Sequence, residues 1–542
     1  MILSPHVTRV VLVVVVAGSL VLGALGTRVA RPAPAGPTVP TSGGTLTIAF
    51  VPFATHIDVS SSNIGTIGEL AHYFYETLYD RDGHGQVKGL LVKEDQVSAD
   101  GLTWTWRLQP NVRFHDGSPF NAMAVKWNFD RKFQKRLVLY DLLPFKSVEV
   151  VDDLTVRVGL SRPAPNLRSI LVTKTFSMYS PVFAQQVGDD ALRSQASGTG
   201  PFVVVDFRPN EILRMRKNPN YWQKGLPYLD EIVFRVVPDA TARAAMLEAG
   251  DADVALALSV PDLQRLKTRR GLKVQQALGS QQYYVTINNR KPPFNDVRVR
   301  RALNHAVDKQ GIINTVFLGN AKPATAFYIN PTVDGHVHAG TYDYNPDKAR
   351  RLLDEAGLAM GPGGVRLYDG RPLSLEFVTR KGATPGDFEM AELVQGMLRA
   401  VGIDARLTVR DSATFISRTW LPPDRATYDL VNLAFGTFTG DAEYVVRTAY
   451  HSTAVAPRFF NWAFYSNPIV DSLIDESMKA TTSPGRNRIY YSQIIRQVFQ
   501  DAPAILLVDI TQRVAMKDIV HGVYLERAAN TWPAKYAWKE KR

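Results

Sequence analysis

Two short motifs contain histidines whose spacing could support metal binding or proton transfer. His336 and His338 flank Val337 in a glycine-bounded loop, where two imidazoles could share a metal ion if a third ligand came from elsewhere. His115 and Asp116 could form half of a proton relay, but the Asp116-Gly117 pair is also a hairpin-turn signal. Both motifs are more typical of polar loops. We therefore predict a solvated loop at 336–338 and a turn at 115–117.

Established catalytic signatures are missing from the sequence. It contains no G-x-S-x-G, H-E-x-x-H or G-x-x-x-x-G-K-[ST] motif. The glycine cluster at 361–364 lacks a preceding strand and a following helix, so a surface turn is favoured there over a dinucleotide site. The absence of cysteine excludes disulfides, thiolate zinc sites, iron–sulfur clusters, cysteine nucleophiles and a lipidated N-terminal cysteine. We predict a protein that is not an enzyme and has no cofactor and no metal site.

Length and composition favour a large globular chain. At about 150 residues per domain, 542 residues make three to four domain-sized units, and 45% apolar with 21% charged residues can build packed cores. The net charge of +12 falls to +9 when the three arginines of residues 1–35 are removed. These charges are dispersed rather than clustered among stacking aromatics, which argues against a nucleic-acid partner and leaves a mild preference for anionic ligands.

The N-terminus has the pattern of an export signal. Arg9 precedes an apolar run, Val10–Leu25, that ends in small residues. The run is about 16 residues long, short of the ~20 that a membrane-spanning helix needs. We predict cleavage between about Thr27 and Pro37 and an exported product without a lipid, with a retained anchor as the alternative. Residues 31–44 form a Pro- and Gly-rich spacer, so folded structure should begin near Thr45.

Hydrophobic periodicity predicts a β-rich segment in the first third of the folded part. A period of two at 46–50 predicts a strand, and helical spacing from Ile67 to Leu78 predicts a helix. Apolar residues alternate again over Leu102–Leu108 and on both sides of Asp152-Asp153, which is typical of antiparallel hairpins.

Longer helices alternate with apolar strands from Pro201 onward. Helices are predicted at Ala240–Ala249, between Asn345-Pro346 and Gly357, and at Met390–Ala400, and a strand follows at 403–409. This alternation predicts mixed α/β packing.

Several sequence blocks resemble the extracellular solute-binding proteins of peptide and nickel ABC transporters, solute-binding protein family 5, which includes dipeptide- and oligopeptide-binding proteins. The blocks follow in order almost from end to end: DGLTWTWRLQPNVRFHDGSPFNAMAVKWNFDR (Asp100–Arg131), SGTGPF (Ser197–Phe202), NPNYW (Asn218–Trp222), the stretch Pro238–Val254, PPFNDVRVRRALNHAVDKQGI (Pro292–Ile312) and YNPDKARRLLDEAG (Tyr344–Gly357).

The resemblance implies an α/β fold of the periplasmic-binding-protein type, with two α/β lobes, hinge strands and an additional β-rich lobe. After a signal peptide and linker start (1–35), the linker and first part of lobe I would occupy 36–72, the additional lobe 73–196, the second part of lobe I 197–278, the opposing lobe 279–498 and the last part of lobe I 499–542. The crossing strands near Tyr283–Ile287 and Ala504–Val508 would act as hinges.

The resemblance also implies a set of ligand-binding residues in the opposing lobe. Arg380 falls where dipeptide binders place an arginine for the peptide carboxylate, although an exposed loop arginine is the equally weighted alternative. Phe438 stands where those proteins hold the ligand's ammonium group with an Asp, Phe435 replaces a pocket Trp, and Thr437 and Thr439 lie between and beside them. A simple dipeptide would therefore lack its usual ammonium partner.

Three further candidates come from the other lobes. Lys174 falls near a basic position that nickel-type relatives turn toward a carboxylate-bearing chelator, although a solvent-facing lysine is more common. His56 and Asp58 follow the first strand in a loop that resembles the family's cleft rim, and Asp58 could equally cap the next turn.

The function implied is that of a periplasmic receptor, a monomer that captures a peptide or small carboxylate-bearing solute and delivers it to the permease subunits of an inner-membrane ABC importer. The alternatives are a carrier of nickel or another metal chelate and, more distantly, a secreted hydrolase, which would need a nucleophile–base pair that no motif supplies.

Overall fold

The computed structural model describes residues 39–52, 56–61, 65–82, 85–137, 139–381, 384, 386–437, 439–480, 486–525 and 535–540. The predicted signal segment and Phe438 lie outside the described residues. The chain divides into the units Met1–Val39 and Pro40–Arg542, and all described helices and strands belong to the second unit. None of the helices in the described ranges is long and apolar enough to cross a membrane.

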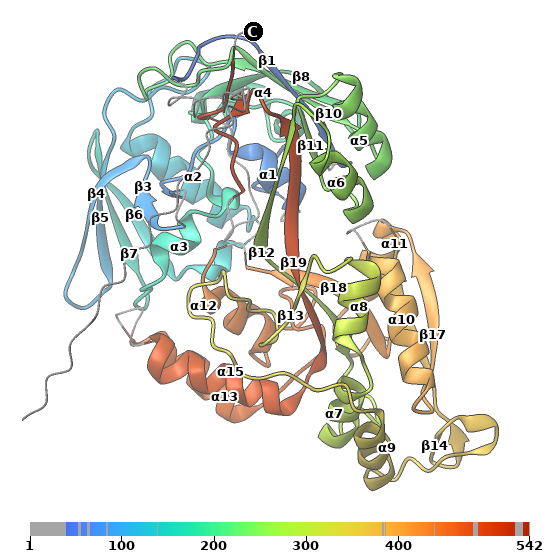
Figure 1. Cartoon of the computed structure of the whole chain (residues 1–542). Coiled ribbons are helices and arrows are strands. Elements are labelled where there is room, and N and C mark those ends of the chain that lie inside the picture. Colours follow the sequence, from blue (N-terminus) through green and yellow to red (C-terminus); the bar gives the residue numbers. More distant parts are fainter. Residues whose placement is uncertain are drawn as a thin grey trace, which may run out of the picture. The chain divides into compact units, whose positions relative to one another are not determined.

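An eleven-stranded mixed sheet runs through the second unit (Figure 1). Ten strands follow the order β17-β16-β18-β12-β19-β11-β1-β10-β9-β8, and β13 pairs with β19 off this path. Their bounds are β1 Thr45–Phe50, β8 Phe202–Arg208, β9 Ile212–Lys217, β10 Glu231–Val236, β11 Val254–Leu256, β12 Leu272–Ile287, β13 Lys322–Pro323, β16 Ser374–Arg380, β17 Asp404–Arg410, β18 Leu430–Gly436 and β19 Ala504–Lys517.

Two long central strands, β12 and β19, link the two ends of this sheet. They run antiparallel side by side between β11 and β18 (Figure 1). The predicted crossing segments pair directly, with Tyr283 opposite Val508 and Val285 opposite Ile505, and the register shifts between Leu278 and Gln282. Both predicted segments are strands, and their role as hinges stays a prediction.

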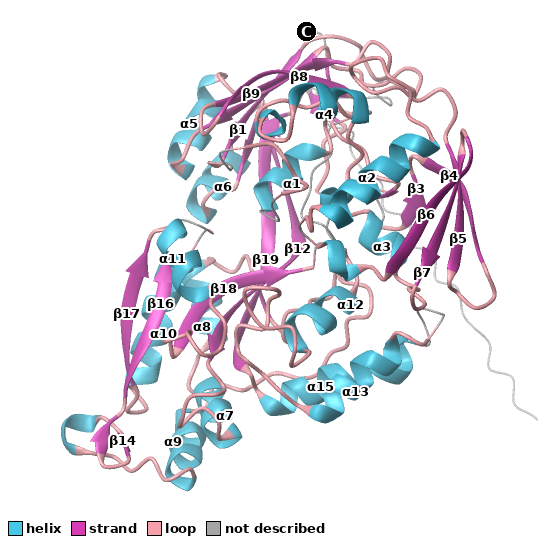
Figure 2. Ribbon diagram, turned by 180° about the vertical axis from the view of Figure 1, so that it is seen from behind, coloured by secondary structure: helices cyan, strands magenta, loops and turns pink. Residues whose placement is uncertain are grey.

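A separate four-stranded antiparallel sheet lies in the segment predicted as β-rich (Figure 2). Its order is β4-β5-β7-β6, with bounds β4 Val92–Val97, β5 Thr103–Leu108, β6 Phe145–Asp152 and β7 Thr155–Leu160. Trp104 and Trp106 alternate with less buried residues along β5, as the period of two predicts. Trp106 packs against Phe129 of α2 (Ala122–Gln134) with 5.8 Å between ring centroids, so the helix covers the apolar face of this sheet.

The capping signals in the sequence place several helices correctly. α5 spans Ala240–Ala249 and ends at Gly250, which has a left-handed conformation. α9 spans Pro346–Glu355, and the Asn345 side chain accepts the N–H of Lys348 at its start. The other longer helices are α6 Val260–Lys267, α7 Val297–His305, α8 Lys309–Val316, α10 Asp387–Arg399, α11 Ser412–Thr419, α13 Pro468–Ser477 and α15 Ser492–Asp501.

The first helix is shorter than its sequence pattern predicts. α1 spans Gly65–Ala71, so the prediction of helix as far as Leu78 is wrong. The carbonyls of Tyr73 and Phe74 accept the N–H groups of Phe202 and Gly200 instead of continuing the helix. A tertiary backbone contact thus overrides a helical periodicity.

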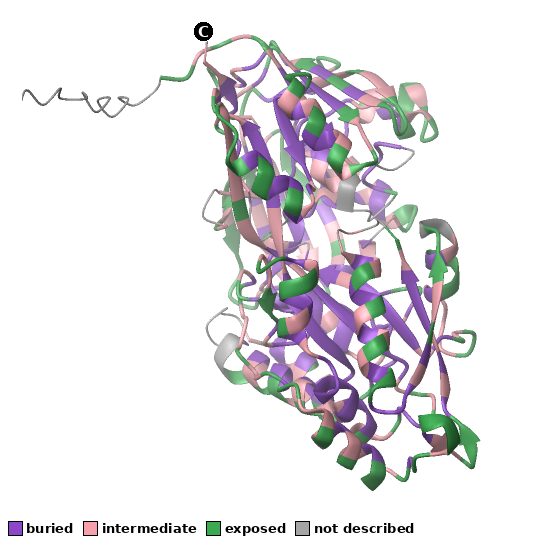
Figure 3. Cartoon of the chain, turned by 45° about the vertical axis from the view of Figure 1, so that its right-hand side comes forward, coloured by how far each residue is buried: buried purple, intermediate pink, exposed green. Residues whose placement is uncertain are grey.

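The remaining short elements and the burial pattern complete the unit. They are α3 Leu167–Leu171, α4 Pro181–Val187, α12 Ala442–Val445 and the strand pairs β2 Tyr79–Arg81 with β3 Val87–Gly89, β14 Leu367–Tyr368 with β15 Arg371–Pro372, and β20 Val520–His521 with β21 Trp538–Lys539. The central strands β11, β18 and β19 of the large sheet are mostly buried, whereas the outer faces of the surrounding helices are exposed (Figure 3). The mixed α/β architecture with an additional antiparallel sheet agrees with the predicted fold class.

Candidate ligand-binding site

Arg380 ends a buried strand and projects a charge that is not neutralised locally. β16 is parallel to β17 and to β18, and its last residue, Arg380, lies opposite Arg410. Ligands of open α/β sheets commonly bind outside the carboxyl ends of such strands. The half-buried Arg380 guanidinium lies 4.5 Å from the centre of the Phe415 ring, and the described residues offer it no carboxylate within ion-pair distance. Burial lowers the pKa of Arg380, because it disfavours the charged form of the guanidinium.

Asp387 is the acidic side chain with the largest electrostatic influence on Arg380. Its oxygens, however, accept hydrogen bonds from backbone amides. It accepts the N–H of Thr384 at 3.1 Å and of Phe388 at 2.9 Å, at the start of α10. Its charge opposes the effect of burial on the pKa of Arg380 without forming an ion pair. Arg380 therefore keeps its donor groups available for a carboxylate, which a guanidinium can bind in a bidentate manner.

Phe435 is part of an aromatic cluster rather than an isolated pocket wall. It lies on β18 and is 5% exposed. Its ring centroid is 5.0 Å from that of Phe460, 5.9 Å from Trp462 and 6.0 Å from Tyr328. These contacts give Phe435 a packing role that supports the end of β18, and its predicted contact with a ligand stays a prediction.

Thr437 and Thr439 use their hydroxyl groups to shape the loop after β18. The N–H of Thr439 donates to the Thr437 hydroxyl at 3.1 Å, and the two hydroxyl oxygens are 3.0 Å apart. Thr437 also donates to the carbonyl of Asp441, and both threonines are buried. Phe438, which stands between them, lies outside the described residues. The structure thus gives the threonines a structural role and leaves the prediction for Phe438 untested.

Lys174 is already paired with an acid. Its ammonium nitrogen is 3.3 Å from an oxygen of Asp80. Burial acts to raise the pKa of the Asp80 carboxyl, but Lys174, Lys535 and the N–H of Arg81 together lower it. Both residues line a cavity of about 130 Å³ together with His72, Glu76 and Tyr536. A ligand carboxylate would have to compete with Asp80 for this lysine.

Asp58 closes the turn that follows β1. It accepts the Ser60 N–H at 2.9 Å, the Ser60 hydroxyl at 2.7 Å and the Tyr179 hydroxyl at 2.7 Å. Burial favours the neutral acid, but these donors outweigh it and lower the pKa of Asp58. The capping interpretation of Asp58 is the one that the structure shows. His56 is buried beside it, and burial lowers the pKa of its imidazole.

The seven predicted residues that the structure describes fall into two groups. Arg380, Phe435, Thr437 and Thr439 lie on β16, on β18 and in the loop after β18. Lys174, His56 and Asp58 belong to the other parts of the chain, and Arg81 links Asp80 to this loop by donating to the carbonyl of Thr439. Sequence reasoning missed Phe415, because an aromatic residue on an amphipathic helix carries no signal that it will face an arginine.

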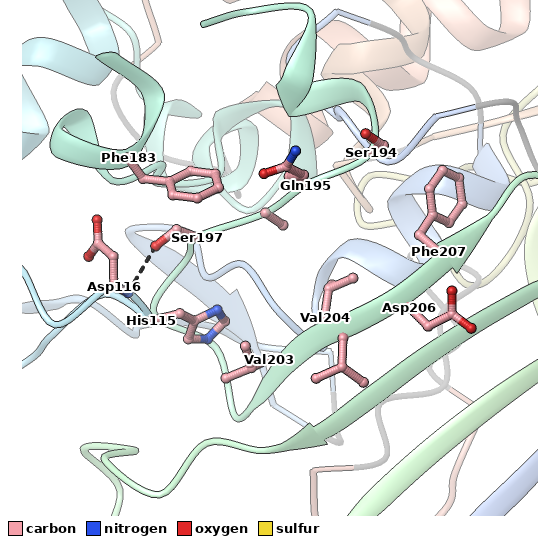
Figure 4. A pocket seen from close by; sticks show the side chains of 12 residues that line it. His115, Asp116, Phe183, Ser194, Gln195, Ser197, Val203, Val204, Asp206 and Phe207 are labelled. Atoms are coloured by element: carbon pink, nitrogen blue, oxygen red, sulfur yellow. Dashed lines mark hydrogen bonds between the residues drawn. The ribbon is translucent and has the colours of Figure 1, made fainter. Parts of the chain in front are cut away.

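The His115–Asp116 motif lies at a second cavity, of about 320 Å³, beside β8 (Figure 4). His115 bonds the carbonyl of Gly200 at 3.0 Å, whereas the Asp116 carboxylate accepts the hydroxyls of Ser118 and Ser180. The Gly117 N–H donates to the carbonyl of Phe114. The predicted turn is confirmed, and the two side chains do not form a relay.

The other motifs also occupy loops. His336 bonds the Thr325 hydroxyl at 3.1 Å, and no group of three or more metal-binding side chains occurs in the described ranges. Residues 362–364 form an exposed turn in which Gly363 has a positive φ.

Comparisons with known proteins agree with the resemblance. Residues 86–457 match the model of the bacterial extracellular solute-binding proteins, family 5. The glutathione-binding protein GsiB of Pectobacterium atrosepticum is 31% identical over 462 residues, which cover 84% of this chain and 86% of that protein.

Solved structures share the fold. The oligopeptide-binding protein AppA of Bacillus subtilis, in complex with a nonapeptide, superposes with a TM-score of 0.83 at 22% identity over 93% of this chain and 100% of AppA. NikA of Brucella suis, in complex with Fe(III)-EDTA, gives a TM-score of 0.81 at 25% identity over 92% of this chain and 100% of NikA.

Proposed function

The chain belongs to family 5 of the bacterial extracellular solute-binding proteins, and we propose that it is the periplasmic receptor of an ABC importer for small peptides or other carboxylate-bearing solutes. Members of this family are transport receptors rather than enzymes, so the chemistry required is reversible capture. The solute would bind at the end of β16 and in the loop after β18, and closure about β12 and β19 would enclose it.

Arg380 is the observation that carries the proposal. Its guanidinium is half-buried over Phe415 and has no acidic partner within ion-pair distance among the described residues. Removing a charge partly from water without a partner is unfavourable, and an incoming carboxylate would relieve this cost. A charge-assisted hydrogen bond contributes about 1.5–3 kcal/mol, which corresponds to roughly a 10- to 100-fold gain in affinity.

The ammonium side of the site argues against simple zwitterionic dipeptides. The resemblance places Phe438 where the family uses an acid, and an aromatic face offers a cation only about 0.5–2 kcal/mol. Asp441 is a poor replacement for that acid, because it is 6% exposed and its carboxylate already accepts the N–H of Glu443 at 2.6 Å. We therefore favour anionic solutes, peptides with a blocked or displaced amine such as glutathione, and longer peptides held by main-chain contacts.

The same proposal covers export and delivery. Residues 1–35 would direct the chain to the periplasm and be removed, and the product would carry no lipid because the sequence has no cysteine. The lobes would comprise 36–72, 197–278 and 499–542 on one side and 279–498 on the other, with 73–196 as the additional lobe. Permease subunits in the inner membrane would receive the solute from the monomeric receptor.

Carriage of a metal chelate is the alternative function. It would place an acidic chelator beside Lys174, as the resemblance to nickel-type relatives implies. Lys174 is bound to Asp80, so the structure favours the Arg380 site over this one.

Calorimetry on matched variants tests the proposal. The purified chain is titrated with glutathione, dialanine and a tetrapeptide, while native mass spectrometry identifies any solute that copurifies. Arg380→Ala should weaken the bound ligand by about 10- to 100-fold. Arg410→Ala, which removes the exposed arginine opposite Arg380, should have no effect. Chemical alteration of the solute with turnover, or equal effects of the two variants, would contradict the proposal.

A further inference from the structure

Arg513 is a second arginine whose hydrogen-bonding capacity is largely unused. It lies on the central strand β19 and is 7% exposed. One terminal nitrogen donates to the carbonyl of Asn320 at 3.1 Å, whereas the buried Nε has no hydrogen-bond partner. The described residues place no carboxylate within ion-pair distance of it. A buried donor without a partner is costly, so this position demands an explanation.

Two other buried arginines show how this chain satisfies a guanidinium that has a purely structural role. Arg243 donates to the carbonyls of Val237, Pro238, Leu256 and Ala257 at 2.6–2.9 Å. Arg300 donates to the carbonyls of Phe294, Asn295 and Asp501 at 2.7–3.2 Å. In both side chains, Nε and the two terminal nitrogens all donate hydrogen bonds. Arg513 differs because it holds one carbonyl and leaves Nε open.

A chain of contacts leads from Arg513 to the region of Arg380. Asn320, which Arg513 binds, donates its N–H to the carbonyl of Phe317 at 2.7 Å. The Phe317 ring lies 5.9 Å from that of Tyr283 on β12. The Phe317 ring also lies next to Gly386, the residue before α10, and Asp387, which influences Arg380, begins that helix.

The electrostatics of Tyr283 agree with this placement. Burial raises the pKa of the Tyr283 hydroxyl, and the charges of Arg380 and Arg513 both act in the opposite direction. This agrees with the contacts through Asn320 and Phe317, which lead from Arg513 to Tyr283 and to the start of α10. Asp387 acts on the same hydroxyl with a negative charge, and its oxygens bind the backbone amides of Thr384 and Phe388.

We propose that Arg380 and Arg513 form two anion subsites in the neighbourhood of Tyr283, and that the solute therefore carries two acidic groups. This inference rests on the proposed function and narrows its solute class from carboxylates in general to dicarboxylates. Two carboxylates held at fixed positions by two guanidinium groups would discriminate against a solute with one acid.

A double-mutant design tests the assignment of each carboxylate. Glutathione carries two carboxylates, and two derivatives each have one of them converted to an amide. Arg513→Gln should weaken the binding of glutathione by about 10- to 100-fold. The same variant should weaken the binding of one of the amides by less than about threefold, because that amide already lacks the carboxylate that Arg513 binds. Arg380→Gln should show the same pattern with the other amide. Equal weakening of all three ligands, or no weakening, by Arg513→Gln would overturn the proposal.

Stability measurements separate a binding role from a structural one. In ligand-free protein, Arg513→Gln should leave the urea midpoint unchanged or raise it, because it removes an unpaired buried charge. Arg300→Gln is the matched control and should lower the midpoint, because it breaks several carbonyl contacts. A fall of equal size in the two variants would refute the inference.

A result with the parent chain distinguishes this inference from the proposed function. If the parent binds neither glutathione nor either of its two amide derivatives, the assignment of a peptide as the ligand is wrong. The arginine pair is then tested by the rise in melting temperature that succinate causes relative to chloride at equal ionic strength. Loss of that rise in Arg513→Gln supports the pair, and no rise in the parent, or an unchanged rise in the variant, overturns it.

Discussion

Asp509, on the central strand β19, should make folding stability depend on pH in an unusual direction. It is 1% exposed and accepts the Gln282 amide N–H at 2.8 Å. Burial is the main influence and raises its pKa to about 7, although Gln282 and Lys322 act against it. An ordinary aspartate in the unfolded chain titrates near pH 3.9. Between these two values the folded state binds the extra proton, so stability should fall as pH rises from about 4 to 7.

The magnitude follows from the two pKa values. They differ by about three, and each pKa unit corresponds to 1.36 kcal/mol, so ionised Asp509 costs the folded state up to about 4 kcal/mol at pH 8. Asp509→Asn removes the ionisation and keeps an oxygen that can accept from Gln282. The variant should therefore be about 2–4 kcal/mol more stable than the parent at pH 8, and the difference should shrink toward zero near pH 4.

Urea unfolding of both proteins between pH 4.5 and 8 measures this difference directly. Other groups titrate over the same range, but their effects cancel when the variant is compared with the parent at each pH. Asp424→Asn, at an exposed aspartate, is the control and should show no difference. A variant less stable than the parent at pH 8, or a difference that does not depend on pH, would refute the reasoning.

Three further predictions concern named contacts. His115 is held neutral because burial lowers its pKa to about 4; since the unfolded imidazole titrates near 6.5, stability should fall as pH drops from about 6.5 to 4, and His115→Gln should reduce that fall in urea unfolding. Glu76 accepts from Tyr221, Trp222 and Thr199, so Glu76→Ala should lower the unfolding free energy by about 3–5 kcal/mol and Glu76→Gln by less. Phe415→Leu should remove the aromatic face beneath Arg380 and weaken ligand binding in calorimetry by about 0.5–2 kcal/mol, whereas an unchanged affinity would show that the ring does not position the arginine.

Local signals in the sequence predicted those elements whose ends depend on their own residues. Gly250 closes α5 because its left-handed conformation is cheap only for glycine, and Asn345 caps α9 through its own side chain. The helix predicted to reach Leu78 failed because distant residues, Gly200 and Phe202, bind the carbonyls of Phe74 and Tyr73. No periodicity within a window of a dozen residues contains that information.

The same distinction separates the candidate residues of the site. For Asp58 and Lys174, the choice between a ligand-binding and a structural role depended on whether another side chain would reach them. Tyr179 binds Asp58, and Asp80 pairs with Lys174, both from elsewhere in the chain. The sequence did not indicate Arg513 as a candidate for ligand binding, because a single basic residue in an apolar strand is typical of an edge or solvent-facing position. Only its burial and its open Nε distinguish it.

Compensation of charge decides which basic residue is available to a solute. Lys174 and Arg380 were both candidates for a carboxylate, and both are partly withdrawn from water. Lys174 has Asp80 at 3.3 Å, so a ligand would gain only the difference between two similar ion pairs. Arg380 meets an aromatic ring and no carboxylate within ion-pair distance among the described residues, so a ligand carboxylate would replace water rather than a protein acid. Because affinity depends on that difference, we expect the arginine at the end of β16 to be the stronger determinant of which solutes this receptor takes.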